Sequence, residues 1–189
     1  MRMSELVDLH ARAVAAFGDR LKAVGGDQWH LLTPCADWDV HGLVNHVLNE
    51  NRWTPPLLAG MTMQEVGDRF DGDLLGEDPM ANWKDAAREA VGAVTEEALS
   101  RTVHVSFGDI SGEEYVSQLT TDHVIHTWDL ARGIKTEERL APDLIDFALE
   151  YLGPRAEDWR AAGAFGSKVE VDAGADRQTA LLAMTGRRA

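Results

Sequence analysis

The sequence predicts an all-α protein in which four long helices form a bundle and a short appendage of mixed structure follows. Apolar residues recur at helical spacing over most of the first 152 residues. Only one short stretch there, TVHVSF, alternates as a strand does. The 189 residues suit a single domain with a real core. We expect one domain over 1–189, with the bundle at about 3–152 and the appendage at about 153–189.

The first helix is predicted from apolar residues spaced three and four apart, and Gly25-Gly26 end the pattern. Its stripe is Leu6, Leu9, Ala13, Ala16, Phe17 and Leu21. Asp39 is well placed to cap a second helix, and we expect Pro55-Pro56 to bound it. The stripe of this second helix is Val40, Leu43, Val44, Val47 and Leu48.

The third helix is expected to begin near Met80, after a connection rich in Gly and Asp. It carries Trp83, Ala87, Val91, Val94 and Leu99. TVHVSF is expected to form a short extended segment, flanked by turns at Gly108 and Gly112.

The fourth helix is predicted from about Gly112 to Ala131, closing with Arg132 and Gly133. Pro142 suits the first turn of a fifth helix that runs through Leu152. In the remainder we expect loop, a strand at SKVEV and a short helix around Ala180.

Composition and charge exclude several classes of function. With 44% hydrophobic and 26% charged residues, the chain has the composition of an ordinary globular protein. A net charge of -14 argues against nucleic acid as a partner and against anionic membrane surfaces. Cys35 is the only cysteine, so no internal disulfide and no cysteine-based zinc knuckle is expected. The N-terminal segment is amphipathic, without the apolar core typical of a signal peptide, and no stretch approaches roughly 18 apolar residues, so we expect a cytoplasmic protein.

The segment TTDHVIHTWDLARG, residues 120–133, carries the candidate site. Asp122 and His126 interrupt the apolar stripe of the fourth helix at an i, i+4 spacing, which points both side chains the same way. An unpaired carboxylate buried there would cost several kcal/mol, and a divalent metal shared with the imidazole would remove that cost. The rest of the stripe is Tyr115, Leu119 and Leu130.

A third ligand is available in the second helix. His46 lies at the margin of that helix's apolar stripe, where it could face a neighbouring helix. A set of His46, Asp122 and His126 would leave coordination positions open for water or substrate. His123 lies farther from the stripe and is expected to be a neighbour rather than a ligand. The alternative is a hydrogen bond between Asp122 and His126 with no metal.

These residues resemble a known family. TPCADWDVHGLVNHVL followed by DHVIHTWDLARG is similar to the DinB-like superfamily, and more closely to the metal-binding domain of mycothiol-dependent maleylpyruvate isomerase and its short actinobacterial relatives. The resemblance implies a DinB-like four-helix bundle that binds zinc, or another divalent ion such as nickel, through His46, Asp122 and His126. Asp122 stands where the isomerase has Glu. The isomerase has a further C-terminal domain, and this chain is too short to hold all of it.

The leading functional hypothesis is a metal-dependent thiol transferase or isomerase. The metal would hold a thiol cofactor such as mycothiol as thiolate, which would attack a small electrophile. Asp129 and Arg132 are the candidate contacts to the thiol cofactor, and no catalytic residue is assigned. Cys35 is interpreted as loop packing, because nothing in the sequence shows a base beside it.

Two other functions stay open. The first is a non-catalytic metal-binding or stress-associated module, with a homodimer as its candidate assembly. The apolar flank at Ile125 and Trp128 could form the dimer face, or could be extra core under the tail. The second is a bundle that has kept the fold and lost the metal.

Overall fold

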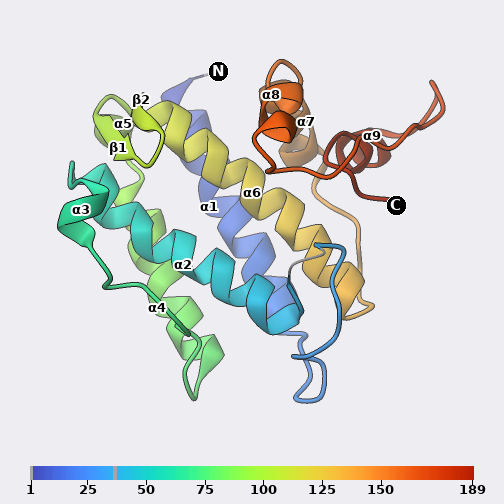
Figure 1. The fold of residues 1–189 in the computed structure, drawn as a ribbon, viewed down its shortest axis with the longest axis horizontal. Helices are drawn as coiled ribbons and strands as arrows, with labels where there is room; N and C mark the ends of the chain where they lie inside the picture. The colour runs from blue at the N-terminus through green and yellow to red at the C-terminus, as the bar shows by residue number, and fades with distance from the viewer. Residues whose placement is uncertain (1, 36–37) are drawn as a thin grey trace.

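The computed structural model describes residues 2–35 and 38–189, and in these residues helices dominate (Figure 1). Two short strands, both described in full, form an antiparallel hairpin. The elements in chain order are α1 (Met3–Leu21), α2 (Val40–Leu58), α3 (Met63–Val66), α4 (Pro79–Ala93), α5 (Glu96–Leu99), β1 (Thr102–Val105), β2 (Gly108–Ser111), α6 (Gly112–Gly133), α7 (Pro142–Leu152), α8 (Ala156–Ala161) and α9 (Arg177–Met184).

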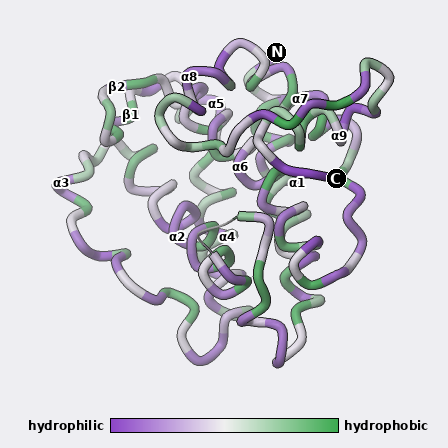
Figure 2. The backbone as a smooth tube through the Cα atoms, turned by 45° about the vertical axis from the view of Figure 1, so that its right-hand side comes forward, coloured by the Kyte–Doolittle hydropathy of each residue, from purple (hydrophilic) through white to green (hydrophobic). Residues whose placement is uncertain are grey.

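Four long helices, α1, α2, α4 and α6, form the bundle, which confirms the predicted all-α class. Helix α6 packs along α1 and beside α2, and α4 packs against both α1 and α2 (Figure 1). Each of these helices carries both hydrophobic and hydrophilic residues, as expected where a helix turns one face to the core (Figure 2). In the part of the chain that the structure describes, no helix is both long and apolar enough to cross a bilayer.

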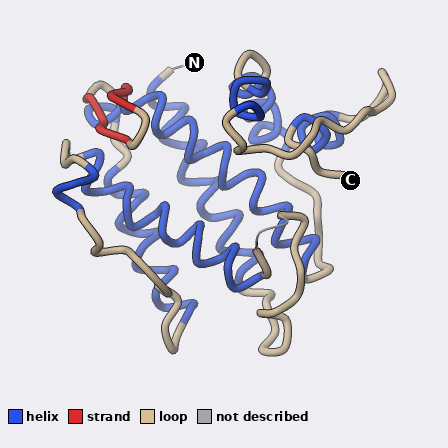
Figure 3. Tube along the Cα trace, viewed as in Figure 1, coloured by secondary structure: helices blue, strands red, loops and turns tan. Residues whose placement is uncertain are grey.

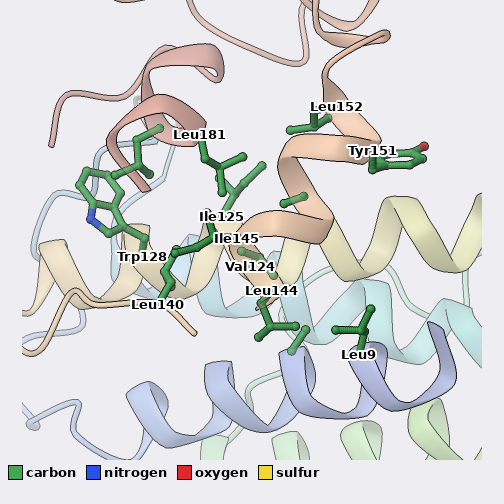
Figure 4. Close-up of a cluster of buried hydrophobic side chains, with 13 residues drawn as sticks. Leu9, Val124, Ile125, Trp128, Leu140, Leu144, Ile145, Tyr151, Leu152 and Leu181 are labelled. Atoms are coloured by element: carbon green, nitrogen blue, oxygen red, sulfur yellow. The ribbon is translucent and has the colours of Figure 1, made fainter. Parts of the chain in front are cut away.

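The tail of the chain covers one flank of α6. Ile125 and Trp128 are buried there, against residues of α7 and α9 and of the segment before α7 (Figure 4). Leu140, Leu144 and Leu181 belong to the same cluster. This flank is therefore extra core under the tail, and it is not available as the dimer face that the sequence left open.

Two predicted helix ends are wrong. Helix α2 runs through Pro55-Pro56 to Leu58, because two prolines this close to the end remove only two helical hydrogen bonds and their φ suits a helix. The third helix, α4, ends at Ala93, so Val94 and Leu99 lie outside it. The chain restarts as the short helix α5 because the Thr95 side chain accepts a hydrogen bond from the backbone of Ala98.

The secondary structure after the bundle was predicted less accurately than that of the bundle. SKVEV is not a strand: residues 167–171 are irregular and make one backbone hydrogen bond, from Val169 to Ala183, and none of the described residues forms a strand beside them. Helix α8 was not expected. The helix around Ala180 is confirmed as α9, and Pro142 begins α7 as predicted.

TVHVSF forms β1 and the start of a hairpin, which confirms the extended segment. Thr102 pairs with Ser111 and Val105 with Gly108 (Figure 3, red). The tip of this hairpin leaves Phe107 70% exposed. The hairpin lies near α3 at one end of the bundle (Figure 1), and this places an exposed aromatic ring at that end.

His10 is buried in the bundle and is held neutral. Its Nδ1 donates to Thr120 Oγ1 at 3.3 Å, because that hydroxyl already donates to the carbonyl of Val116. Burial, helped by the neighbouring His123, lowers the pKa of His10 to about 3. The unfolded chain therefore binds a proton near pH 6.5 that the folded chain does not take up until about pH 3.

It follows that the free energy of unfolding falls as the pH drops below about 6.5. We expect His10 to contribute up to about 1.4 kcal/mol per pH unit to this slope. In His10→Gln, which keeps an N–H donor but does not titrate, the slope between about pH 6 and 4 should be shallower by that amount. Urea unfolding at a series of pH values measures both slopes, and equal slopes would contradict the buried neutral imidazole.

Candidate metal centre

The candidate site lies where α2 passes α6. Asp39 caps the start of α2, as predicted: its side chain accepts a hydrogen bond from the backbone N–H of Gly42 at 2.8 Å. Helix α2 contributes His46, and α6 contributes Asp122 and His126. One ligand atom of each of these three residues lies within 4.8 Å of the other two. The structure thus brings the three predicted residues together.

The distances within this cluster suit a bound ion. His126 Nε2 lies 3.2 Å from one oxygen of Asp122, and His46 Nε2 lies 3.5 Å from the other. Two ligand atoms that each bind a tetrahedral zinc at about 2.1 Å stand roughly 3.4 Å apart. The three side chains therefore need little movement to share one ion.

One oxygen of Asp122 lacks a hydrogen-bond donor in the part of the chain that the structure describes. Asp122 Oδ2 is buried and receives no hydrogen bond from the described residues; His46 Nε2, at 3.5 Å, is too far for a good one. A buried carboxylate oxygen without a donor is costly, and a cation would satisfy it. The residues present fit a divalent metal.

The cluster is open on one side. The side chains of His46 and Asp122 are 25% and 33% exposed, whereas that of His126 is 7% exposed. Asp122 is thus less enclosed than its place in an apolar stripe suggested. An ion held here would be reachable for a further ligand from the side of His46 and Asp122.

The charges of the cluster are strongly coupled. Burial works against ionisation of Asp122, yet His126 and His46 hold the pKa of Asp122 well below its usual range. Burial likewise works against a charged His126, but Asp122 and then Asp129 raise the pKa of His126 to about 9. Without an ion the cluster is therefore a protonated imidazole beside a carboxylate, and a metal must displace that proton.

The orientation of His126 is fixed from behind. His126 Nδ1 donates to Asp129 at 2.9 Å, which leaves Nε2 turned toward Asp122. Arg187 donates to both oxygens of Asp129, at 2.7 and 2.6 Å. Burial tends to raise the pKa of Asp129, but His126 and Arg187 keep it low. A carboxylate behind a histidine ligand is the usual means of fixing its tautomer and ring.

Asp129 and Arg132, the predicted contacts to a thiol cofactor, are placed differently from one another. Asp129 is fully buried, so its carboxylate is positioned to orient His126 rather than to meet a cofactor. Arg132 pairs with Glu138 at 2.7 Å and lies over the ring of Trp128, and its side chain is 38% exposed. Its role at a cofactor stays a prediction.

The ring of Trp38 packs against both histidines of the cluster. Trp38 stacks on His46 with 4.3 Å between ring centroids and meets His126 edge-on at 5.7 Å. His123 is turned elsewhere: its Nδ1 donates to the carbonyl of Leu119 at 2.8 Å and its ring packs near Phe17. His123 is a neighbour of the cluster, in line with the prediction from the helical wheel.

Two residues of this region were missed from the sequence. Glu50 follows His46 by one turn of α2, and burial and then the charge of Asp122 raise its pKa. The i, i+4 spacing from His46 to Glu50 was a usable signal. Arg187 had no signal of its own, because nothing in the sequence indicates which cation reaches the buried Asp129.

A comparison with known families decides which family this site belongs to. Residues 10–131 match the sequence model of the mycothiol maleylpyruvate isomerase N-terminal domain, and this span includes all three clustered residues. The chain belongs to this family. Membership of the mycothiol maleylpyruvate isomerase N-terminal domain family confirms the resemblance stated from the sequence.

Individual proteins agree with this assignment. Two matches in Mycobacterium tuberculosis, the uncharacterized proteins MT0763 (strain CDC 1551 / Oshkosh) and Rv0738 (strain H37Rv), are each 30% identical over 145 residues, which cover 71% of this chain and 70% of theirs.

Solved structures support the fold of the family. The crystal structure of mycothiol-dependent maleylpyruvate isomerase superposes with a TM-score of 0.63 at 15% identity, over 89% of this chain and 75% of that one. A point mutant of that isomerase gives a TM-score of 0.66 at the same identity and coverage. At this level of identity the likeness concerns the fold, and it confirms the DinB-like four-helix bundle.

Proposed function

We propose that this protein is a divalent-metal-dependent thiol transferase or isomerase that acts on a small electrophile. One observation carries the proposal: His46, Asp122 and His126 stand at metal-ligand spacing, with a buried carboxylate oxygen unsatisfied and one side open. A set of three protein ligands with an open position is the usual design of a catalytic rather than a structural zinc site.

The ligands we propose are His46 Nε2, the carboxylate of Asp122 and His126 Nε2. Although Asp122 has a shorter side chain than the Glu that the resemblance gives for the isomerase at this position, it lies within 3.5 Å of both imidazoles. Zinc is the first candidate because two imidazoles and a carboxylate suit it, and nickel is the second. Mycothiol is the proposed thiol because the structural relative at 15% identity is described as mycothiol-dependent.

The bound ion would lower the pKa of the thiol and hold it as thiolate. The residues of this chain then have separate tasks. His46, Asp122 and His126 hold the site, and Asp129 with Arg187 keeps the proton of His126 on Nδ1. The ring of Trp38 limits the movement of His46 by stacking on it. The thiolate would supply the nucleophile for the electrophilic carbon, and in a transfer reaction the displaced group would leave with its bonding electrons.

This function predicts thiol consumption that depends on the cluster. With zinc, mycothiol and chlorodinitrobenzene, the wild type should form the thioether faster than the uncatalysed reaction. His126→Ala should lose more than about 100-fold of this activity, beyond the 10–100-fold typical when a residue behind a ligand is removed. Absorbance of the thioether measures both rates.

His41→Ala is the matched control, because His41 also lies on α2 near a carboxylate, 3.5 Å from Asp73, but outside the cluster. It should keep wild-type activity. An equal loss in both variants would contradict the proposal. Metal binding without turnover of any electrophile would favour the non-catalytic metal-binding module.

A further inference from the structure

We propose that the electrophile binds in a groove between α2, α6 and the β-hairpin, and that it is an uncharged molecule with an apolar body rather than a dicarboxylate. This inference rests on the proposed function and names its substrate class. The groove has a volume of about 370 Å³, which lies within the range of small-molecule sites. It is built by residues outside the metal cluster.

The groove starts one turn from the proposed ligands on both helices. Glu50 lines it from α2, four residues after His46, and Gln118 lines it from α6, four residues before Asp122. One turn of helix is about 5.4 Å, a distance that a small substrate can span. A molecule in the groove could therefore place a reactive carbon toward the open side of the cluster.

The outer part of the groove is apolar and aromatic. Trp53 and Leu57 line it from α2, and Met63 from the start of α3. Phe107, 70% exposed at the tip of the hairpin, also lines the groove. An exposed aromatic ring that lines a groove is suited to contact a flat apolar body.

The charges of the groove argue against an anion. None of its lining residues is Lys or Arg, and the described residues include no Lys or Arg paired with Glu50. The groups that act electrostatically on Glu50 are Asp122, His46 and His126, and Glu50 in turn acts on Tyr115. Whether Glu50 is protonated or ionised, the groove offers no positive partner to a carboxylate.

A dicarboxylate meets a specific obstacle here. One of its carboxylates could occupy the open metal position, but the other would then lie in a groove whose lining holds Glu50 and uncharged side chains, with no Lys or Arg to pair with it. The overall charge of -14 adds repulsion at longer range. An aryl halide or a similar uncharged electrophile has no such second charge.

The reaction of a thiol with an aryl halide needs no reactant besides these two substrates. The sulfur of the thiol forms a bond to the aryl carbon, the carbon–halogen bond breaks, and halide leaves with the electron pair. The proton of the thiol is released to water. No oxidant or reductant is needed.

Binding in the groove can be tested without metal, thiol or turnover. Dinitrobenzene and dinitrobenzoate are unreactive probes that share a ring and differ in one carboxylate. On metal-free protein, calorimetry should show that dinitrobenzene binds at least about 10-fold more tightly. Phe107→Ser should weaken dinitrobenzene binding several-fold, and it alters an exposed side chain that the fold does not need.

At a pH high enough to ionise Glu50, Glu50→Gln should narrow the difference in affinity between the two probes, because it removes a negative charge that lines the groove. Glu89→Gln is the control of equal charge change: Glu89 pairs with Arg52 on the bundle surface and does not line the groove. Equal affinity for both probes in the wild type, or unchanged affinity in Phe107→Ser, would overturn the inference. If the wild type binds dinitrobenzene more tightly than dinitrobenzoate but does not consume thiol, the proposed function is overturned and the inference about the groove stands.

Discussion

Replacing Arg187 with methionine should lower the free energy of unfolding by about 3–5 kcal/mol. Asp129 is fully buried, and both of its oxygens receive a hydrogen bond from Arg187, whose side chain is only 10% exposed. Removing the guanidinium leaves a buried carboxylate with His126 as its remaining charged partner. Urea unfolding of metal-free protein at neutral pH measures the loss.

The neighbouring residue offers the control for this prediction. Arg188 lies one position later in the same tail and is exposed, so Arg188→Met should change stability by less than about 0.5 kcal/mol. The double variant Asp129→Asn with Arg187→Met should be more stable than Arg187→Met alone, because it no longer buries a carboxylate that has lost its guanidinium partner. If Arg187→Met lowers the free energy of unfolding by less than about 1 kcal/mol, the ion pair contributes no more than an exposed pair does, and the prediction is wrong.

Zinc should stabilise the wild type by about 4 kcal/mol when the free ion is about 1,000 times its dissociation constant. The gain arises because the folded chain brings His46, Asp122 and His126 together, whereas the unfolded chain does not. His126→Ala removes one ligand of the three and should abolish most of this gain. Unfolding curves with zinc and with a chelator measure the difference for each variant.

His41→Ala should keep the full stabilisation by zinc, since His41 lies outside the cluster. A second comparison concerns the arm length of the carboxylate. Asp122→Glu should retain stabilisation and Asp122→Asn should lose most of it, because only a carboxylate brings the negative charge. Undiminished stabilisation in His126→Ala would place the zinc elsewhere on the protein.

The bundle was largely predictable because each long helix buries one stripe and its apolar residues record that burial. The errors lie where long-range contacts decide the local structure. Pro55-Pro56 end a helix in most contexts, yet here they fall close enough to its end to be accommodated. SKVEV has strand-like residues but no partner strand among the described residues, and the local sequence does not reveal whether such a partner exists.

The three clustered residues were predictable for a similar reason. Asp122 and His126 break an apolar stripe at a helical spacing, and His46 stands on the helix that packs beside it. The support behind the cluster was not predictable, because Arg187 lies 58 residues from Asp129 in the chain. The groove beside Glu50 likewise depends on how the hairpin packs near α2, which no local pattern records.

Metal content of the untagged protein tests the central claim most directly. After incubation with zinc and removal of excess by gel filtration, elemental analysis should find about one ion per chain in the wild type and in His41→Ala. His46→Ala and His126→Ala should each hold less than about a tenth of that amount. A wild type that retains no ion, or ligand variants that retain as much as the wild type, would contradict a metal centre at His46, Asp122 and His126.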